Sequence, residues 1–416
     1  MQIARDIYLS TLNAKRGNGL IKIVTGIRRC GKSYLLRNLF TQLLREEGVP
    51  ARRIITIDLE DFANRKLRDA EELYAYVKSR IFDDGPYYVI LDEIQRVDDF
   101  EDVTMGIMHI SGVDVYVTGS NSKFLSTDVI TEFRGRGDQI HLRPLSFAEY
   151  LSACGGPERK AWQDYYTFGG LPLVASMTAD EERIEYLRGL FDTVYLRDIC
   201  ERNDIRHEEP LEALISILAS ADGSLTSLRA IQNTFKSTAR VAVTDKTIKS
   251  YIDHLKDAFL IQEAEQFDVK GRRYISSPKK YYFEDVGLRN AWLGMRQQDE
   301  NHIMENVIYN ELMCRGWLVD VGVVPVTEMG DDGKRHQKRL EIDFIARRGS
   351  DQVYIQSAFA MPTTEKLEQE YRPLRKLRDS FRKFVITHDD VRTRQDDDGI
   401  VTMGLIDFLL DVDSLG

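Results

Sequence analysis

Gly26-Ile27-Arg28-Arg29-Cys30-Gly31-Lys32-Ser33 is a complete match to the pattern G-x-x-x-x-G-K-[ST]. The match follows an apolar, β-branched run at residues 21–25 and precedes a helix-like apolar repeat at residues 34–44. A glycine-rich loop between a strand and a helix turns backbone N–H groups toward an anion, and the helix adds the positive end of its dipole. The sequence therefore predicts a phosphate-binding loop; the alternative is a plain glycine turn before a structural helix.

Each residue type in this loop has an expected contact. Gly26 and Gly31 permit positive φ angles and a close approach of the backbone to a polyphosphate. Lys32 should reach the β and γ phosphates as a point charge, and the Ser33 hydroxyl should bind the Mg²⁺ that bridges them. The expected nucleotide-binding segment consists of Gly26, Ile27, Arg28, Arg29, Cys30, Gly31, Lys32, Ser33 and Tyr34.

A second motif comes after the run at residues 87–91, which is apolar at every position, as in a strand buried on both faces. Asp92 and Glu93 come next, and the C-terminal ends of parallel strands are where open α/β sheets bind ligands. We expect Asp92 to hold the Mg²⁺ shell through water and Glu93 to accept a proton from the attacking water. Charged residues also end strands where a chain merely surfaces, but the preceding loop favours the catalytic interpretation.

The apolar runs alternate with helix-like stretches, which indicates a parallel sheet covered by helices on both faces. The expected strands are residues 21–25, 54–57, 87–91, 113–118 and 139–142. One strand, residues 54–57, intervenes between the loop and the acidic motif. This order is typical of the additional-strand division of P-loop NTPases.

Two further groups of residues can contact the γ-phosphate. Ser120 or Asn121, after the strand at residues 113–118, can sense it; an ordinary turn is the alternative. Arg134 and Arg136 precede the strand at residues 139–142, and a guanidinium there can stabilise developing charge, within the subunit or across an interface. Simple salt bridging is the alternative for both arginines.

Six motifs in this order resemble the AAA-type ATPase domain called AAA_14. They are GIRRCGKS at residues 26–33, LDEIQ at 91–95, TGSNS at 118–122, GR at 135–136, PLSF at 144–147 and GGLP at 169–172. The stretch FEDVGLRN at 283–290 and the residues after it resemble its usual partner, the DUF4143 region. The resemblance implies an ATPase using Mg²⁺. Gly170-Leu171-Pro172 also looks similar to the Gly-x-Pro that contacts adenine in related NTPases of the signal-transduction type, which implies that Pro172 contacts adenine; a plain turn is the alternative. The preference for ATP over GTP rests on this resemblance.

Residues 206–294 have the outline of a winged helix: three helices at 211–221, 225–236 and 244–260, and a hairpin at 261–283 that turns through residues 270–272. Basic and aromatic residues there can bind DNA, although such modules also serve only in packing. The basic residues are Lys246, Lys249, His254, Lys256, Lys270, Arg272, Arg273, Lys279 and Lys280, with Tyr274 and Tyr281 interleaved.

The last part of the chain resembles the PD-(D/E)xK nuclease fold. Its expected strands are residues 340–346, 353–358 and 383–387, and strict alternation puts Leu340, Ile342 and Phe344 on one face and Glu341 and Asp343 on the other. Such a site needs two carboxylates and a lysine.

The nuclease-like positions in this sequence are Glu305, Asp343, Gln356 and Ala358, so two of the four lack the required group. We therefore expect an inactive site, unless a migrated lysine such as Lys366 restores it. A basic helix at residues 371–383 can bind a nucleic-acid backbone or be a solvated face. Its cations are Arg372, Arg375, Lys376, Arg378, Arg382 and Lys383.

Composition sets limits on these interpretations. The 416 residues carry 57 Lys and Arg against 67 Asp and Glu, a net charge of −10, so nucleic acid can be bound only by a local basic patch. Four separated cysteines favour a reducing compartment without disulfides, and the absence of a long apolar run favours a cytoplasmic protein with no membrane contact.

The expected architecture is α/β and multidomain. It comprises a P-loop ATPase domain at 1–150, a helical lid at 151–205, a winged helix at 206–294 and a nuclease-like, inactive α/β domain at 295–416.

This architecture leads to three hypotheses. The first is an ATP-driven switch or motor that couples Mg²⁺-dependent ATP hydrolysis to DNA or protein binding. The second is a metal-dependent endonuclease gated by ATP, with Glu305 and Asp343 as ligands. The third is a nucleotide-occupied module with little turnover, whose Glu93, Arg134 and Arg136 assemble only on self-association or with a protein client.

Overall fold

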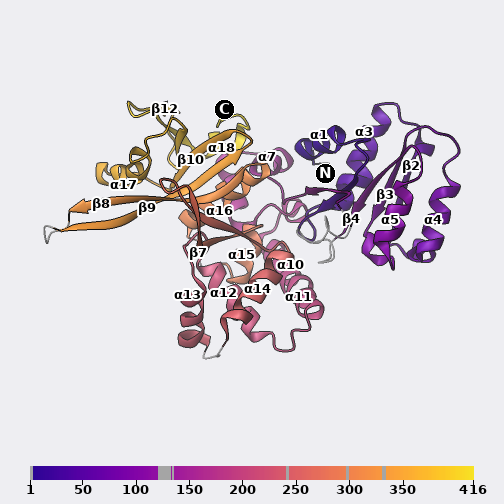
Figure 1. Ribbon diagram of the computed structural model, residues 1–416, viewed down its shortest axis with the longest axis horizontal. Helices are drawn as coiled ribbons and strands as arrows, with labels where there is room; N and C mark the ends of the chain where they lie inside the picture. The colour runs from indigo at the N-terminus through magenta and orange to yellow at the C-terminus, as the bar shows by residue number, and fades with distance from the viewer. Residues whose placement is uncertain (1–2, 120–132, 134, 240–242, 297–298, 330–333) are drawn as a thin grey trace. The chain divides into compact units, whose positions relative to one another are not determined.

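The structure is a computed structural model that describes residues 3–119, 133, 135–239, 243–296, 299–329 and 334–416. The chain divides into two compact units (Figure 1). The first comprises residues 1–144 with 257–259, and the second comprises residues 145–256 with 260–416. The expected boundary at residue 150 lies close to the observed one. Residues 151–416 belong to the second unit apart from 257–259, and their division into three domains stays a prediction.

The first unit is built on a five-stranded sheet in which every pair of neighbouring strands is parallel. The strands are β1 (Ile21–Thr25), β2 (Ile54–Asp58), β3 (Tyr87–Asp92), β4 (Val113–Thr118) and β5 (Gly137–His141), in the order β2-β3-β4-β1-β5. All five expected strands are confirmed, with ends that differ by at most two residues. Because β4 lies between β1 and β3, the phosphate loop and the acidic motif leave strands that are not adjacent.

Helices cover both faces of this sheet, as expected (Figure 1). They are α1 (Asp6–Ala14), α2 (Lys32–Tyr34), the π-helical η1 (Leu35–Phe40), α3 (Thr41–Glu46), α4 (Ala70–Ser79) and α5 (Phe100–Met108), with 3-10 segments η2 (Ala51–Arg53), η3 (Phe62–Arg68) and η4 (Ile94–Arg96). Leu73 of α4 and Ile107 of α5 share one buried cluster with Val89 of β3. On the opposite face, the ring of Phe40 lies 4.7 Å from that of Tyr116.

The second unit begins with six helical segments, of which the first two end at a glycine. These are α7 (Phe147–Cys154), α8 (Glu158–Phe168), α9 (Pro172–Ala175), α10 (Asp180–Leu190), η6 (Phe191–Leu196) and α11 (Arg197–Arg202). Ser146 and Glu149 form a capping box at the start of α7. Gly155 ends α7 and Gly169 ends α8, both at positive φ, where a residue with a side chain would be strained.

Three helices and a hairpin come next, in the expected order. They are α12 (Glu209–Ser220), α13 (Leu228–Thr234) with η7 (Phe235–Ala239), α14 (Asp245–Asp257), β6 (Ile261–Asp268) and β7 (Arg273–Phe283), and then α15 (Val286–Trp292). The hairpin is not an isolated wing, because β6 also pairs in parallel with the later strand β8. The assignment of this part as a winged helix stays a prediction.

The hairpin is one edge of an eight-stranded mixed sheet with the order β12-β13-β11-β10-β9-β8-β6-β7. The other strands are β8 (Leu318–Met329), β9 (Arg335–Arg348), β10 (Asp351–Ala358), β11 (Arg382–Thr387), β12 (Arg394–Gln395) and β13 (Ile400–Gly404). The helices of this part are α16 (Glu300–Cys314), α17 (Thr364–Arg375) and α18 (Leu405–Leu410). The three strands expected here are confirmed as β9, β10 and β11.

The expected basic helix at residues 371–383 is wrong. The side chain of Thr363 accepts the N–H of Lys366 and caps α17, which ends at Arg375. Residues 382–387 instead form the strand β11, which pairs in parallel with β10 and β13. Its last residues, Val385, Ile386 and Thr387, are β-branched and favour a strand. The six cations therefore do not share one helix face.

A bulge in β9 interrupts the strict alternation of faces that was expected for this strand. Its pairing with β8 shifts at Asp343 and Phe344, which together lie opposite a single residue of β8. Phe344 packs near Tyr309 of α16, at 6.4 Å between ring centroids. Ile345 instead joins Ile342 in the core cluster that includes residues of α17. The expected placement of Phe344 beside Ile342 is wrong, and both Asp343 and Phe344 face α16.

Among the described residues, no helix is both long enough and apolar enough to cross a membrane.

Candidate functional site

The loop after β1 has the backbone that its glycines allow. Gly26 has φ 139° and Gly31 has φ 102°, and a Cβ on Gly26 would lie 2.1 Å from the backbone oxygen of Leu142. Lys32 is buried, and its Nζ donates to the backbone oxygens of Gly26 at 2.9 Å and Ile27 at 3.0 Å. The ammonium group therefore folds back across the loop that is expected to hold phosphates.

Asp92, the last residue of β3, is only 2% exposed and lies at the centre of several polar contacts. Its Oδ1 accepts from the Thr118 hydroxyl at 2.5 Å, and a further hydrogen bond comes from Ser33. Burial raises the pKa of Asp92 above its ordinary value, and the hydrogen bonds from Thr118 and Ser33 oppose that rise. The structure thus brings together Ser33 and Asp92, the two residues expected to hold Mg²⁺.

Thr118 links the two acids of the motif. Its hydroxyl donates to Asp92 and accepts the backbone N–H of Glu93 at 3.0 Å. Glu93 has φ 56°, an uncommon angle for a residue other than glycine, and its Oε2 accepts from Gln95 Nε2 at 2.5 Å. Sequence reasoning pointed to the residues after β4 and missed Thr118, the last residue of that strand.

Arg37 was also missed. Its Nη1 lies 2.6 Å from Asp58 Oδ2 and 3.3 Å from Asp92 Oδ2. Asp58 ends β2 directly opposite Asp92 in the parallel register. Since Arg37 comes four residues after Ser33, the helical spacing was the signal that could have placed it on the same face.

Arg136 lies at the end of the sheet where the strands begin, whereas the phosphate loop lies at the end where they finish. Its backbone oxygen accepts the N–H of Ile21, the first residue of β1, whereas the loop comes after the last residue. Five residues of β1 separate these ends by roughly 16 Å. The exposed side chain contacts His109 Nε2 at 2.7 Å. A stabilising contact of Arg136 with the loop of its own chain is therefore wrong, while a contact across an interface stays a prediction.

The remaining nucleotide contacts stay predictions. Ser120, Asn121 and Arg134 lie outside the described residues. Pro172 is the first residue of α9 in the second unit, whereas the phosphate loop belongs to the first. Tyr34 at the end of α2 is 40% exposed, so its side chain is accessible to a ligand.

In the second unit, Glu305 and Asp343 lie together as expected, with a lysine between them. Lys280 Nζ is 2.7 Å from Glu305 Oε1, 2.7 Å from Glu341 Oε1 and 3.4 Å from Asp343 Oδ1. Tyr282 donates to the same Glu305 oxygen at 2.7 Å. Burial, followed by the charge of Glu305, raises the pKa of Asp343 to about 7. These five residues form the Lys280 cluster.

The other two nuclease-like positions are elsewhere. Gln356 Nε2 donates to Glu370 Oε2 at 3.1 Å, and Lys366 Nζ lies 2.5 Å from the second oxygen of Glu370. Ala358 belongs to the core cluster that packs against α17. Gln356 and Ala358 therefore point toward α17, whereas Asp343 faces α16.

A nuclease-like site implies a divalent metal, and the residues present do not fit one. The oxygens of Glu305, Glu341 and Asp343 already surround the ammonium of Lys280. A divalent ion needs several oxygen ligands, and a lysine at the centre of the acids both repels it and fills its space. Within the described part of the chain, no group of three or more His, Cys, Asp and Glu is arranged to hold a metal.

The basic residues expected to bind DNA are largely used within the fold. Lys280 is buried, so its expected DNA contact is wrong. Lys279 forms ion pairs with Glu263 at 3.0 Å and Glu265 at 2.8 Å, and Lys256 pairs with the same Glu263 at 2.8 Å. The hairpin and α14 thus present less free positive charge than their sequences indicate.

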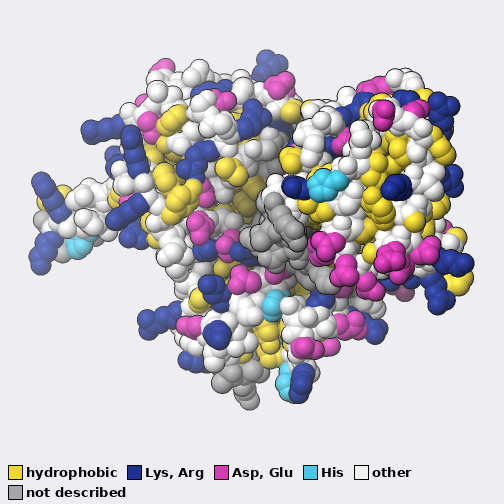
Figure 2. Space-filling view, turned by 45° about the vertical axis from the view of Figure 1, so that its right-hand side comes forward, with side chains coloured by type: hydrophobic (Ala, Val, Ile, Leu, Met, Phe, Trp, Pro, Cys, Tyr) yellow, Lys and Arg dark blue, Asp and Glu magenta, His cyan; other side chains and the backbone are white. Residues whose placement is uncertain are grey.

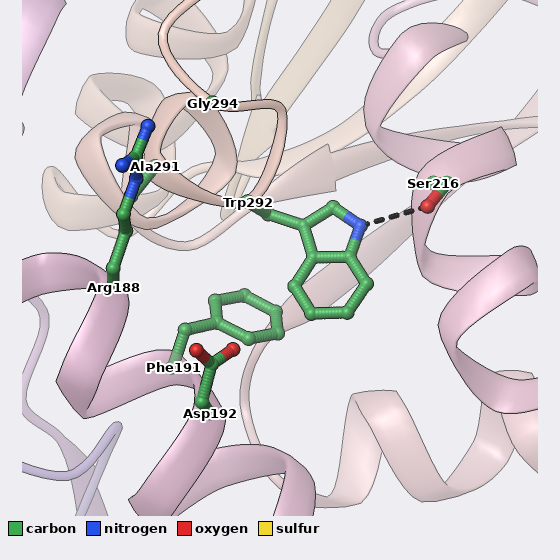
Figure 3. A pocket seen from close by; sticks show the side chains of 7 residues that line it. All are labelled: Arg188, Phe191, Asp192, Ser216, Ala291, Trp292 and Gly294. Carbon is green, nitrogen blue, oxygen red and sulfur yellow. Dashed lines mark hydrogen bonds between the residues drawn. The ribbon is translucent and has the colours of Figure 1, made fainter. Parts of the chain in front are cut away.

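A pocket of about 360 Å³ lies among η6, α12 and α15 (Figure 3). Phe191 and Trp292 form its aromatic wall, at 4.7 Å between ring centroids, and the indole Nε1 donates to Ser216 Oγ at 2.9 Å. Arg188 and Asp192 add one charge of each sign. None of the residues expected to bind nucleotide lines this pocket.

The parallel sheet, the glycine loop and the adjoining acids define the class of a P-loop NTPase, and residues 18–151 match the model of the AAA domain AAA_14. Residues 159–299 match a domain of unknown function, DUF8612, where DUF4143 was expected.

A relative fixes the family of the whole chain. It is an uncharacterized protein of Haemophilus influenzae, 32% identical over 98% of both chains. The chain belongs to the same family as this protein. An uncharacterized protein of Methanocaldococcus jannaschii, MJ1544, is 27% identical over 93% of this chain and 85% of its own.

Two solved structures are similar in part. The Walker-type ATPase PABY2304 of Pyrococcus abyssi has a TM-score of 0.49 and 16% identity, over 70% of this chain and 96% of its own. The Aeropyrum pernix ORC1 protein, solved in complex with DNA, has a TM-score of 0.29 and 14% identity, over 71% of this chain and 93% of its own. Likenesses at these scores carry no conclusion about what this chain binds.

Proposed function

We propose that the chain binds ATP with Mg²⁺ at the loop Gly26–Ser33 and hydrolyses it as a conformational switch or motor. The observation that carries this proposal is the convergence of Ser33 and Asp92, from the loop and from the end of β3, through a hydrogen bond. That arrangement places a hydroxyl and a carboxylate beside the loop that Lys32 spans. Both groups are oxygen ligands of the kind Mg²⁺ prefers.

In this proposal, each residue of the site has one task. The loop N–H groups and Lys32 bind and orient the phosphates. Ser33 and Asp92 hold Mg²⁺, which when bound draws charge from the β and γ phosphates. Glu93 takes the proton of the attacking water, and Thr118 fixes the backbone of Glu93 relative to Asp92. Arg37 keeps Asp92 charged and in place.

The energy of hydrolysis is proposed to drive binding of DNA or a protein client by the second unit. A nuclease function is not supported by the Lys280 cluster, because an internal ammonium takes the place that the metal would need. We therefore keep the ATP-driven switch as the proposed function and the nuclease-like part as an inactive module.

The decisive test is the variant Lys32→Ala. We expect it to weaken ATP binding about 10- to 100-fold, since a charge-assisted contact with the phosphates is lost. Titration calorimetry with Mg²⁺ present measures the binding, and phosphate release measures hydrolysis. Lys66→Ala, an exposed lysine of the same unit, is the matched control. Normal ATP binding and hydrolysis by Lys32→Ala would show that the loop is not the site.

A second function, a nucleotide-occupied module with little turnover by itself, is favoured by the position of Arg136. Since this arginine lies at the sheet edge away from the loop of its own chain, the catalytic site lacks it unless a second copy supplies it. The specific ATPase rate should then rise with protein concentration, with or without DNA. A constant rate over the range in which the protein self-associates would exclude this function.

A further inference from the structure

The strands β8 and β9 continue as a two-stranded arm beyond their neighbours in the sheet (Figure 1). β10 pairs with β9 only over residues 344–348, and β6 pairs with β8 only over residues 321–323. The two arm strands remain paired from Pro325 and Arg339 to Met329 and Arg335. Residues 334–339 are all exposed, so the outer arm adds little to the core. A free two-stranded ribbon is only marginally stable, and the core does not explain its length.

The arm carries a dense run of positive charge on an acidic chain. Its β9 side begins Lys334-Arg335-His336-Gln337-Lys338-Arg339, whereas the chain as a whole has a net charge of −10. Lys and Arg side chains gather on this projecting arm in the space-filling view (Figure 2).

Three of these cations are available to a ligand. Within the described parts of the chain, Arg335, Lys338 and Arg339 form no ion pair, and Glu328 across the ribbon is already paired with Arg372. The described strands of the arm, residues 325–329 and 334–339, thus carry four Lys and Arg against the single acid Glu328, and the acids Asp331 and Asp332 of the connection lie outside the described residues. The strands therefore present a positive surface, as expected for one that meets a polyanion.

Alternation along the strand spreads this charge over both faces of the ribbon. Arg335 and Arg339 point to one face and Lys338 to the other, over a length of roughly 14 Å. The turn after β6 lies beside the base of the arm, because Lys270 Nζ donates to the Pro325 oxygen at 2.8 Å. This turn adds Arg272, an exposed residue, to the same end of the sheet.

We propose that the β8–β9 arm binds double-stranded DNA by entering the major groove, where its cations meet the phosphates of both walls. The major groove of B-form DNA, about 12 Å wide, admits a two-stranded β-ribbon, whereas the deep and narrow major groove of duplex RNA does not. The inference deepens the proposed function, on which it rests for the role of DNA, and it assigns the contact to a surface other than the hairpin β6–β7.

The alternative explanation is protection of an exposed edge, since lysines on such strands prevent edge-to-edge aggregation. Protection does not need a run of one sign, and it gives no affinity for DNA. Binding therefore separates the two explanations.

The test uses the full chain without nucleotide and a fluorescent DNA duplex, with anisotropy measured between about 50 and 200 mM salt. The arm variant combines Arg335→Gln, Lys338→Gln and Arg339→Gln. We expect its affinity to fall about tenfold or more. The slope of log K against log salt should become shallower by about 2 to 3, because each phosphate contact contributes about 0.9.

A matched control removes three exposed cations of the first unit through Arg45→Gln, Arg52→Gln and Lys66→Gln, with the same change in net charge. This control should bind DNA within about twofold of the native chain. The proposal is overturned if the arm variant keeps the native affinity and salt slope, if the native chain does not bind the duplex, or if duplex RNA binds equally well. ATPase activity of the arm variant without DNA should be unchanged, so a failure of ATP binding at Lys32 is a separate result.

Discussion

Thr118 is the residue on which the geometry of the two acids depends, because its single hydroxyl contacts Asp92 and the backbone of Glu93. Two buried polar groups thus share one partner at the end of β4. A hydroxyl at this position serves as both donor and acceptor, which neither Asp92 nor the N–H of Glu93 can do. The position of Asp92, the proposed metal ligand, relative to Glu93, the proposed base, is therefore set by the neighbouring strand β4.

We predict that Thr118→Val lowers the rate of ATP hydrolysis about tenfold and leaves ATP affinity within a few fold. Valine has nearly the shape of threonine but leaves Asp92 and the Glu93 N–H without this partner, at a cost of about 1–3 kcal/mol. Phosphate release measured over a range of ATP concentrations gives kcat and KM separately, and kcat should carry the loss. Thr118→Ser is the control and should retain most of the activity; equal losses in both variants would refute the role of the hydroxyl.

Lys280 gives a second prediction at the scale of single residues. Although burial lowers its pKa, the charges of Glu305, Asp343 and Glu341 raise that pKa above its ordinary value. Lys280→Met should destabilise the second unit by about 3–5 kcal/mol at pH 8, since it leaves buried carboxylates without a cation. The control Lys279→Met should cost about 0–1 kcal/mol, because its ion pairs are partly exposed.

The loss in Lys280→Met should depend on pH with a definite sign. Burial and Glu305 already raise the pKa of Asp343 to about 7, and removing the cation raises it further. The folded state then binds more protons than the unfolded state, so stability falls as pH rises from about 4 through that pKa. Urea unfolding at pH 5 and pH 8 measures the difference. A variant equally destabilised at both values would contradict this account.

At the scale of elements, the hairpin β6–β7 and the bulge in β9 show how local patterns are modified by strand pairing. The hairpin is readable from the two stretches at residues 261–268 and 273–283, which surround the turn Lys270-Gly271-Arg272. The parallel pairing of the hairpin strand β6 with β8, some 55 residues later in the chain, cannot be read from the sequence. The bulge turns Asp343 and Phe344 to one face, so a period of two fails at that point.

Hydrogen exchange tests this view of the hairpin. We predict that the amide of Val269, which donates to the Val323 oxygen at 3.0 Å, is protected to a similar degree as the amides of residues 321–323 of β8, which lie between β6 and β9. An isolated wing would lose protection at its turn before the rest of the sheet opens. The exposed backbone of the β8–β9 arm serves as the internal reference for fast exchange. Fast exchange at Val269 together with the arm would show that the pairing with β8 does not persist.

For the whole molecule, we predict that a second chain supplies Arg136 to the catalytic site, since this arginine lies away from the phosphate loop of its own chain. A mixture of two variants tests this directly. At an ATP concentration that just saturates the native chain, Lys32→Ala should bind little ATP but keeps Arg136, whereas Arg136→Ala keeps the nucleotide site but lacks the arginine. Each variant alone should have little activity, and mixing them should restore a substantial fraction of it. Activity of Arg136→Ala equal to that of the native chain would instead limit Arg136 to its contact with His109.

Short-range patterns were sufficient for the sheet of the first unit and for its phosphate loop. A strand, a glycine loop and a helix adjoin in sequence, and the glycines at residues 26 and 31 have the positive φ angles that the motif requires. The buried run of β3 likewise placed Asp92 at a strand end. These features depend on residues that are neighbours in the chain, so they could be inferred from spacing alone.

Contacts between distant segments were decided only by the tertiary structure. Thr118 contacts Asp92 because β4 pairs with β3. Lys280 forms ion pairs with Glu305 of α16 and Asp343 of β9 because the hairpin belongs to the same sheet as β9. Arg136 lies beside the first residue of β1, and not beside the phosphate loop, because β5 pairs with β1 in parallel. Periodicity indicates which face of an element is buried, but it carries no information on strand order, register or partner, and these determine which charges meet.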